Sequence, residues 1–288
     1  MIDLHDHTNH SDGTDGVVDV LKKAEELRLE MIAITDHDNV DVYDEIATMD
    51  MKNIYSGKLL SGVELKTAFD GVPVEILAYG VDTEKMKKTK CVDDQRKIDN
   101  QNKYLRNYIA VGKGLGIRCD ENIEIKDFGQ FAAVAYFDEI CKYDENYRVV
   151  PELLGGARKD FYRNTMGNKK SPFYVDESKD SVEINELIEI VHDCGGKAFL
   201  AHLFEYRLED HLGFLGRVID ETEIDGIECF YSMFTPEQTE AILRETRARG
   251  KYVSGGSDYH GANKKGVELG AGKGDLNVSY EVVKDWAE

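Results

Sequence analysis

Two stretches of this chain alternate short apolar segments with amphipathic ones, and this alternation limits the possible folds more than any other feature. The first stretch covers residues 1–82 and the second covers residues 181–288. Apolar runs such as residues 31–35 are continuous, which is typical of strands in a parallel sheet that is buried on both faces. The roughly seven strands in β/α alternation predict an α/β fold, either a barrel or a doubly wound sheet.

The same pattern places the individual elements. Strands are predicted at residues 2–5, 31–35, 59–65, 72–79, 197–201, 226–230 and 252–254. Helices are predicted where apolar residues recur every three or four positions, at residues 17–29, 184–191, 212–219 and 236–249. The turn Phe69-Asp70-Gly71 joins two of the strands, which predicts a hairpin inside an otherwise β/α arrangement.

Residues 83–180 interrupt the alternation. Apolar residues at helical spacing predict a long amphipathic helix that includes Ile98, Tyr104, Leu105, Tyr108, Ile109, Val111 and Leu115. We therefore expect residues 1–82 and 181–288 to form one barrel domain. Residues 83–180 are expected to form a mainly helical insertion that caps one end of the barrel and influences the choice of substrate.

The composition excludes several classes of protein. Hydrophobic residues make up 41% of the chain and charged residues 32%, as in globular proteins. No apolar run approaches the ~20 residues that span a bilayer. The five cysteines show no paired spacing, which argues against a disulfide framework and against a thiolate zinc site. The first residues do not resemble a secretory signal, so a cytoplasmic location is expected.

The formal net charge of −20 bears on possible partners. A field of this sign repels polyanions, so non-specific binding to duplex nucleic acid is not expected. A small phosphorylated substrate is still compatible with this charge, because bound cations reverse the local potential. The sequence does not indicate an oligomeric state.

Histidines and carboxylates gather where the predicted strands end. Five of the eight histidines fall at or just after such an end: His5, His7, His37, His202 and His260. Three carboxylates accompany them: Asp12, Glu64 and Asp258. The H-x-H spacing of the first two histidines puts both imidazoles on one face of a strand. In a β/α barrel the strand ends converge on one mouth, where active sites form.

A single histidine at a strand end is more often a hydrogen-bonded core residue than a metal ligand, so the coincidence of five carries the prediction. Carboxylates and imidazoles crowded into one bowl are costly unless cations neutralise the acids. Nitrogen and oxygen ligands favour Mn²⁺, Zn²⁺ or Fe²⁺ over Ca²⁺. The sequence therefore predicts a cluster of divalent ions at the mouth.

Five segments resemble motifs of the PHP (polymerase and histidinol phosphatase) superfamily, in its stand-alone phosphoesterase branch. They occur in the family's order and span nearly the whole chain: DLHDHTNHSDGT, AITDHDNV, SGVEL, AFLAH and SGGSDYHG. SPFYV at residues 171–175 is similar to the segment that returns from that branch's insertion. The resemblance implies a distorted, TIM-like (β/α)7 barrel with two or three divalent ions and a metal-dependent phosphoesterase activity.

The resemblance also implies a ligand set for each ion. The first set contains His5, His7, Glu64 and Asp258. Glu64 would bridge to a second ion, which His202 also binds. The third set contains Asp12, His37 and His260.

Two positions depart from the family pattern. Glu75 stands where relatives usually carry a histidine; its carboxylate can still bind an ion and favours a harder one such as Mn²⁺, or that position is weakly filled or empty. Phe234 stands where relatives often carry a polar residue or a histidine, which puts a substrate contact there in doubt.

The implied reaction is attack of a metal-bound hydroxide on the phosphorus of a phosphate ester. Asp36 and His202 are expected to act in catalysis, Asp36 by orienting an imidazole or, as the alternative, by direct ligation. Five residues are expected to contact the substrate: Arg158, Arg163, Lys170, Arg207 and Ser232. The expected substrate is a small phosphorylated metabolite such as a nucleotide or nucleoside bisphosphate.

Other functions stay open at this stage. Within phosphoesterases, the alternative is an exonuclease that acts on short oligonucleotides. Barrels with an H-x-H motif also cleave amides and lactones, but such sites typically use a lysine at a strand end, which this sequence lacks. A PHP module that binds metal without catalysis is the remaining alternative, and Glu75 and Phe234 keep it open.

Overall fold

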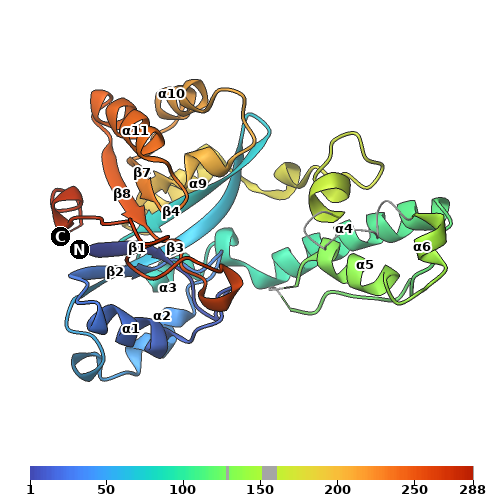
Figure 1. Cartoon of the computed structure of the whole chain (residues 1–288), viewed down its shortest axis with the longest axis horizontal. Coiled ribbons are helices and arrows are strands. Elements are labelled where there is room, and N and C mark those ends of the chain that lie inside the picture. Colours follow the sequence, from blue (N-terminus) through green and yellow to red (C-terminus); the bar gives the residue numbers. More distant parts are fainter. Residues whose placement is uncertain (128–129, 151–160, 288) are drawn as a thin grey trace. The chain divides into compact units, whose positions relative to one another are not determined.

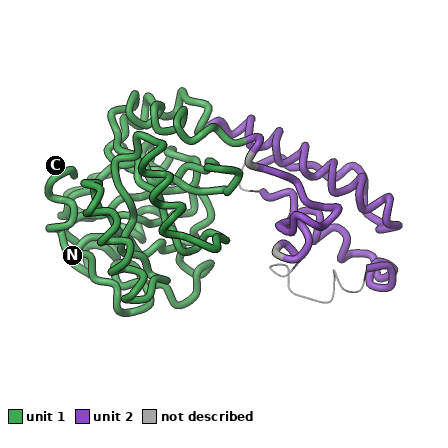
Figure 2. The backbone as a smooth tube through the Cα atoms, turned by 90° about the horizontal axis from the view of Figure 1, so that it is seen from above, with its two compact units in different colours: residues 1–92, 181–288 green, residues 93–180 purple. Residues whose placement is uncertain are grey.

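The computed structural model describes residues 1–127, 130–150 and 161–287, and of Arg163 and Ser178 it describes only the backbone. The chain forms two compact units, residues 1–92 with 181–288 and residues 93–180 (Figure 2). Residues 83–92 thus fall in the first unit, whereas the sequence placed them in the insertion. Met86 and Cys91 explain this placement, because both are buried in the core of the first unit.

The first unit is built on one sheet (Figure 1). Its strands are β1 (Ile2–Asp6), β2 (Met31–Ile34), β3 (Lys58–Phe69), β4 (Val72–Tyr79), β5 (Val182–Glu183), β6 (Lys197–Leu200), β7 (Gly226–Tyr231) and β8 (Tyr252–Gly256). The order across the sheet is β1-β2-β3-β4-β6-β7-β8, and β5 pairs with β3. Beyond β8, the Asp258 N–H donates to the His5 carbonyl at 2.7 Å, which brings the two edges together. The predicted distorted seven-stranded barrel is confirmed.

Strand β4 runs against both of its neighbours, while the other neighbouring strands on this path are parallel. The reversal occurs at the predicted hairpin, where Asp70 and Gly71 have φ of 51° and 69°. Two consecutive residues in the left-handed region are what a tight two-residue hairpin requires. The start of β4 therefore pairs with the end of β3, so that Glu75 lies opposite Lys66 near the mouth.

Helices follow the parallel strands and cover the sheet. The α-helices of this unit are α1 (Val17–Glu26), α2 (Val42–Ala47), α3 (Thr83–Met86), α9 (Ile184–Asp193), α10 (His211–Glu221) and α11 (Pro236–Ala248). Short turns of 3₁₀ helix are η1 (Met51–Asn53), η2 (Lys90–Val92), η5 (Leu203–Glu205), η6 (Gly261–Asn263) and η7 (Tyr280–Val282). Helix α11 begins with a capping box, in which Thr235 and Gln238 satisfy each other's backbone N–H groups.

The barrel has an apolar floor below the polar strand ends. Glu75, Leu77 and Tyr79 alternate along one face of β4, so Glu75 reaches the mouth while the other two lie deeper. Leu77 and Tyr79 are buried in a cluster with Phe199 of β6 and Met31 of β2. Because interiors are close-packed, this floor gives the strand ends above it a rigid base.

The second unit has its own core. Its regular elements are α4 (Asp94–Gly114), α5 (Ala132–Ile140), α6 (Asn146–Val149), the π-helical turn η3 (Tyr162–Met166) and η4 (Glu177–Asp180). Helix α4 confirms the predicted long amphipathic helix, and its Tyr104 and Tyr108 are buried with Tyr136 and Phe173. Although α4 has 21 residues, neither it nor another described helix has the combination of length and hydropathy needed to cross a membrane.

Candidate metal centre

The Glu64 carboxylate lies at the centre of the polar cluster at the mouth. Its Oε1 is 2.9 Å from Nε2 of His202. Its Oε2 is 3.2 Å from Nε2 of both His5 and His7, and 3.3 Å from Nδ1 of His37. Only 1% of the Glu64 side chain is exposed. One carboxylate therefore faces four imidazoles, with each oxygen turned toward a different part of the cluster.

All nine residues predicted as ligands come together here. Within each of four groups, the donor atoms lie within 4.8 Å of one another. The groups are His7 with Asp12, His37 and His260; His5 with Glu64 and His202; His5 with His7 and Asp258; and His37 with Glu64 and Glu75. The structure thus brings each predicted ligand into at least one group that could hold a divalent ion.

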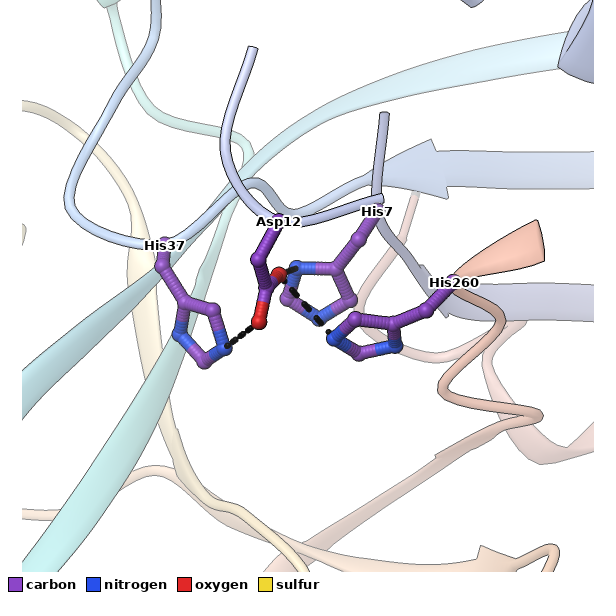
Figure 3. Close-up of side chains that lie close together, drawn as sticks. All are labelled: His7, Asp12, His37 and His260. Atoms are coloured by element: carbon purple, nitrogen blue, oxygen red, sulfur yellow. Dashed lines mark ion pairs between the residues drawn. The ribbon is translucent and has the colours of Figure 1, made fainter. Parts of the chain in front are cut away.

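The group around Asp12 is the most open. Asp12 lies between the three imidazoles (Figure 3), with its Oδ1 3.1 Å from Nε2 of His260. Its Oδ2 is 3.8 Å from Nε2 of His37. The Asp12 side chain is 44% exposed, whereas that of His7 is fully buried. The predicted third set did not contain His7. In the structure His7 belongs to this group and also to the group with His5 and Asp258.

Glu75, which departs from the family pattern, lies within the cluster. Its Oε2 is 3.2 Å from Nε2 of His202, and its Oε1 is 3.7 Å from Nδ1 of His37. A carboxylate at this position adds a negative charge to the centre and leaves the number of donor side chains unchanged. Phe234 is the other departure from the family pattern. Its ring packs against those of Phe204 and Tyr231, with 5.0 and 5.1 Å between the ring centroids.

Several of these side chains stand on unusual backbone. His202 has φ of 20° and Asp258 has φ of 56°, and Asp38, directly after His37, has φ of 47°. Residues with a Cβ rarely adopt positive φ, and such conformations cost free energy unless the surroundings impose them. Their occurrence at three strand ends of one mouth indicates that the fold holds these residues for function.

Glu228 supports the centre and was missed by the sequence analysis. Its Oε1 accepts a hydrogen bond from Nδ1 of His5 at 2.8 Å, and its Oε2 accepts the His202 N–H at 2.8 Å. A carboxylate on one imidazole nitrogen fixes the ring and leaves the other nitrogen free as a ligand. The sequence did contain a signal for this role, namely a charged residue inside the apolar strand Gly226–Tyr231. A charge buried in such a strand needs a partner.

A β-bulge in β7 places a second supporting residue. Opposite β8, Glu228 pairs with Ser254 but Phe230 pairs with Gly255, so one extra residue is inserted. Strict alternation would put Glu228 and residue 230 on the same face. The bulge turns Tyr231 to that face instead, where its hydroxyl donates to Oδ2 of Asp258 at 2.7 Å.

The expected role of Asp36 needs correction. Its carboxylate accepts the Thr8 N–H at 2.8 Å, the Thr8 hydroxyl at 2.6 Å and the Ser11 hydroxyl at 2.5 Å. Ser11 Oγ in turn lies 3.5 Å from Nδ1 of His7. Among the described contacts, Asp36 therefore acts on an imidazole only through Ser11. Its direct task is to hold the loop after β1, because buried backbone and hydroxyl donors need an acceptor.

The predicted substrate contacts are less well defined. Ser232 follows β7 and is buried, and its hydroxyl has no hydrogen-bond partner among the described residues. Arg207 is an exposed residue of the first unit, and Lys170 is an exposed residue of the second. Arg158 and the side chain of Arg163 lie outside the part of the chain that the structure describes.

Burial and mutual attraction oppose each other in the cluster. Burial raises the pKa of Glu64, but the His5 and His37 imidazoles outweigh it and hold that pKa well below its usual value. Burial also raises the pKa of Asp258, but the His5 and His7 imidazoles outweigh burial and hold that pKa well below its usual value. Conversely, burial lowers the pKa of His7, while the nearby carboxylates of Asp258 and Glu64 raise it to about 9. The ion-free centre therefore holds ionised carboxylates and a protonated His7 at neutral pH.

The donor atoms fit divalent cations. Nε2 of His7, Nδ1 of His37 and Oδ1 of Asp12 are buried without a hydrogen-bond partner in the described part of the chain. Buried polar atoms are normally satisfied, so three unsatisfied atoms within one cluster indicate that a ligand binds in the cluster. Imidazole nitrogen and carboxylate oxygen are the donors that Mn²⁺, Fe²⁺ and Zn²⁺ take in proteins.

The raised pKa of His7 predicts how the ion-free protein responds to pH. A folded-state pKa of about 9, above the usual 6.5, contributes stability that is complete below pH 6.5 and is lost as the pH rises through 9. A divalent ion must displace this proton, so its affinity rises over the same range. We expect the Tm of metal-stripped protein to fall between pH 7 and 9.5, while Mn²⁺ binds more tightly. Calorimetry that shows no proton release on Mn²⁺ binding would contradict this expectation.

Replacing Glu228 by glutamine is expected to weaken metal binding by about 10- to 100-fold, because the amide no longer fixes His5 as the carboxylate does. Mn²⁺ titration of the stripped protein measures the change, and kcat/KM at limiting Mn²⁺ should fall in parallel. Glu223→Gln, at an exposed position just before β7, is the matched control. Equal Mn²⁺ affinity in both variants would show that Glu228 does not support the centre.

Several bacterial enzymes are similar in sequence to this chain along most of its length. A 5′-3′ exoribonuclease of Haemophilus influenzae is 24% identical over 263 residues, which cover 90% of this chain and 89% of that protein. The 5′-3′ exoribonuclease Rnm of Escherichia coli is 24% identical over 264 residues, covering 90% and 85%. A phosphoribosyl 1,2-cyclic phosphate 1,2-diphosphodiesterase of Eggerthella lenta is 26% identical over 268 residues, covering 90% and 94%.

Solved structures share the fold. A protein of Bifidobacterium adolescentis, described as a metal-dependent phosphoesterase, superposes with a TM-score of 0.67 at 22% identity and covers 99% of this chain and 94% of its own. An amidohydrolase of Chromobacterium violaceum superposes with a TM-score of 0.66 at 20% identity, covering 91% and 88%. At these identities the likeness establishes the architecture.

The family is established by the sequence itself. The model of the PHP domain matches residues 3–221, which is more than half of the chain. The matched region contains seven of the nine residues of the four groups, and the remaining two, Asp258 and His260, follow β8 in the same mouth. The chain belongs to the PHP domain family and is a metal-dependent phosphoric ester hydrolase.

Proposed function

We propose that this protein hydrolyses a phosphate ester of a nucleotide, with a small nucleotide or nucleoside bisphosphate as its substrate. The observation that carries the proposal is the convergence of nine residues with nitrogen or oxygen donors, with Glu64 at their centre. The names of the relatives support the choice of substrate, because an exoribonuclease and a phosphoribosyl diphosphodiesterase both cleave phosphate esters of ribose. The negative net charge of the chain disfavours long polyanions, which supports a small substrate.

We propose that two or three ions bind among these residues, with Mn²⁺ favoured beside Glu75. When bound, such ions activate water and neutralise charge on phosphate oxygens. The chain's own residues would provide the geometry for this chemistry. Glu64 would join two ion positions, Glu228 would keep Nε2 of His5 turned inward, and Asp36 would hold the loop that carries Asp12.

A second candidate is 5′-3′ exonuclease action on short RNA. The similarity to two 5′-3′ exoribonucleases, each across 90% of this chain, favours this candidate. It would use the same centre with a different leaving group, the 3′ oxygen of the terminal nucleotide, so that the remaining chain keeps the phosphate. The two candidates therefore differ in both substrate and product.

The test is to supply Mn²⁺-loaded protein with nucleoside monophosphates, nucleoside bisphosphates and short 5′-phosphorylated RNA. Release of inorganic phosphate from the small nucleotides supports the first proposal, whereas stepwise release of nucleoside monophosphates from RNA supports the second. Parallel assays on p-nitrophenyl phosphate, carboxylic esters and amides test the amide-cleaving alternative. Metal-loaded protein that cleaves none of these phosphate esters would favour a binding module without catalysis.

A further inference from the structure

Asp258 faces two different environments. Its Oδ1 is turned toward the imidazoles, at 3.6 Å from Nε2 of His5, 3.4 Å from Nε2 of His7 and 3.2 Å from Nδ1 of His260. Its Oδ2 is turned the other way, toward the Tyr231 hydroxyl and the Lys264 ammonium. One oxygen thus belongs to the candidate metal centre, and the other belongs to its edge.

Lys264 is held at this edge and is still accessible. Its Nζ donates to the Tyr231 hydroxyl at 2.9 Å and lies 4.9 Å from the centre of the Tyr231 ring. The Lys264 side chain is 25% exposed, compared with 9% for that of Asp258. A partly exposed positive charge therefore lies beside Asp258 at the edge of the imidazole cluster, oriented by a buried tyrosine. An ammonium has three N–H donors, so it can keep its bonds to Tyr231 and Asp258 and donate a third to an anion.

The loop that carries Lys264 is fastened to the loop after β1. The Asn263 side chain donates to the Asp12 carbonyl at 2.7 Å, and the Ala262 N–H donates to the Thr14 hydroxyl at 2.9 Å. Because Asp12 is itself a candidate ligand, these bonds fix Lys264 relative to the centre. A substrate-contacting group needs such fixed placement to act on a transition state.

We propose that Lys264 is a substrate-contacting residue that binds a non-bridging oxygen of the phosphate, with Tyr231 as its positioning residue. The inference rests on the proposed function and extends it, because it names a residue that distinguishes phosphate esters by charge. A phosphomonoester dianion carries one more negative charge than a diester, so it gains more from this ammonium. Lys264 therefore favours monoesters over diesters.

The test compares Lys264→Gln, Lys264→Arg and Lys265→Ala in the Mn²⁺-loaded protein. Lys265 is the exposed neighbour of Lys264 and is the matched control. For p-nitrophenyl phosphate, Lys264→Gln should lower kcat/KM by about 10- to 100-fold, the range for a lost hydrogen bond to a charged group. For bis(p-nitrophenyl) phosphate the loss should be smaller. Lys264→Arg should recover part of the activity, and Lys265→Ala should match the wild type.

Metal content and Tm separate substrate contact from a purely structural role. Retained manganese with the monoester-selective loss supports the proposal. Two results would instead show that Lys264 only stabilises Asp258. One is a loss of manganese proportional to the loss of activity, and the other is an equal fall in kcat/KM for the monoester and the diester. Unchanged kinetics in Lys264→Gln would also overturn the proposal.

Binding of inorganic phosphate distinguishes this inference from the proposed function. If the wild type cleaves no phosphate ester, phosphate binding to the Mn²⁺-loaded protein is measured by calorimetry. At least tenfold weaker binding to Lys264→Gln, with wild-type binding to Lys265→Ala, would support the Lys264 contact although the proposed function had failed. Equal phosphate binding in both variants would reject the contact itself.

Discussion

Glu64→Gln is expected to lower kcat/KM by about a thousandfold or more. Glutamine is neutral, and its amide group offers one oxygen where the carboxylate offers two. It therefore cannot join two cation positions, and the loss of several kcal/mol of charge stabilisation corresponds to this change in rate. Steady-state kinetics at saturating Mn²⁺, together with the manganese content of the purified variant, measures the effect.

The control for this variant is Glu240→Gln on α11, which makes the same chemical change at an exposed position. It should retain wild-type activity and metal content. Glu64→Gln should keep the fold, because the amide can still accept a hydrogen bond where Oε1 lies near His202. Activity within tenfold of the wild type in Glu64→Gln would show that this carboxylate does not organise the centre.

His7→Ala is expected to abolish turnover while the protein stays folded. His7 belongs to two of the four donor groups, so its loss removes a ligand from both. It also removes a buried imidazole that is protonated in the ion-free protein, which takes a positive charge away from Glu64 and Asp258. We expect retained manganese to fall by at least one ion per chain, as measured by elemental analysis, and kcat/KM to fall below detection.

His192→Ala provides the comparison, because His192 lies on α9 and its Nε2 pairs with Asp225 at 2.7 Å. This variant should bind manganese and turn over substrate like the wild type. Circular dichroism of both variants checks the fold. A His7→Ala protein that retained both its manganese and its turnover would refute the ligand assignment.

The sequence predicted that the candidate ligands lie together because their positions follow from the strands. His5 and His7 are two apart at the end of β1, and His202 follows the end of β6, so β/α topology brings them to one mouth. Glu75 reaches the mouth for a different reason: it lies near the start of an antiparallel strand. Its assignment depended on the resemblance to a family, since a rule about the C-terminal ends of strands does not include it.

The supporting residues could not be placed from the sequence in the same way. Tyr231 faces inward because β7 contains a bulge, and one inserted residue reverses the alternation that the sequence alone suggests. Lys264 lies in a loop whose path is set by hydrogen bonds to Asp12 and Thr14, far away in the chain. Asp36 looked like a partner of an imidazole, but the hydroxyls of the neighbouring loop compete for its oxygens.

The four donor groups have a consequence for how many ions the centre can load. They form a closed ring, because neighbouring groups share His5, His7, His37 or Glu64. A neutral imidazole has one lone pair to give, whereas a carboxylate can serve two cations at once. An ion that takes His7 into the Asp12 group therefore withdraws it from the Asp258 group. Successive ions would compete for the same nitrogens, so later ions would bind with lower affinity. Two ions in the pair of groups joined by Glu64 would share only a carboxylate and would not compete with each other in this way.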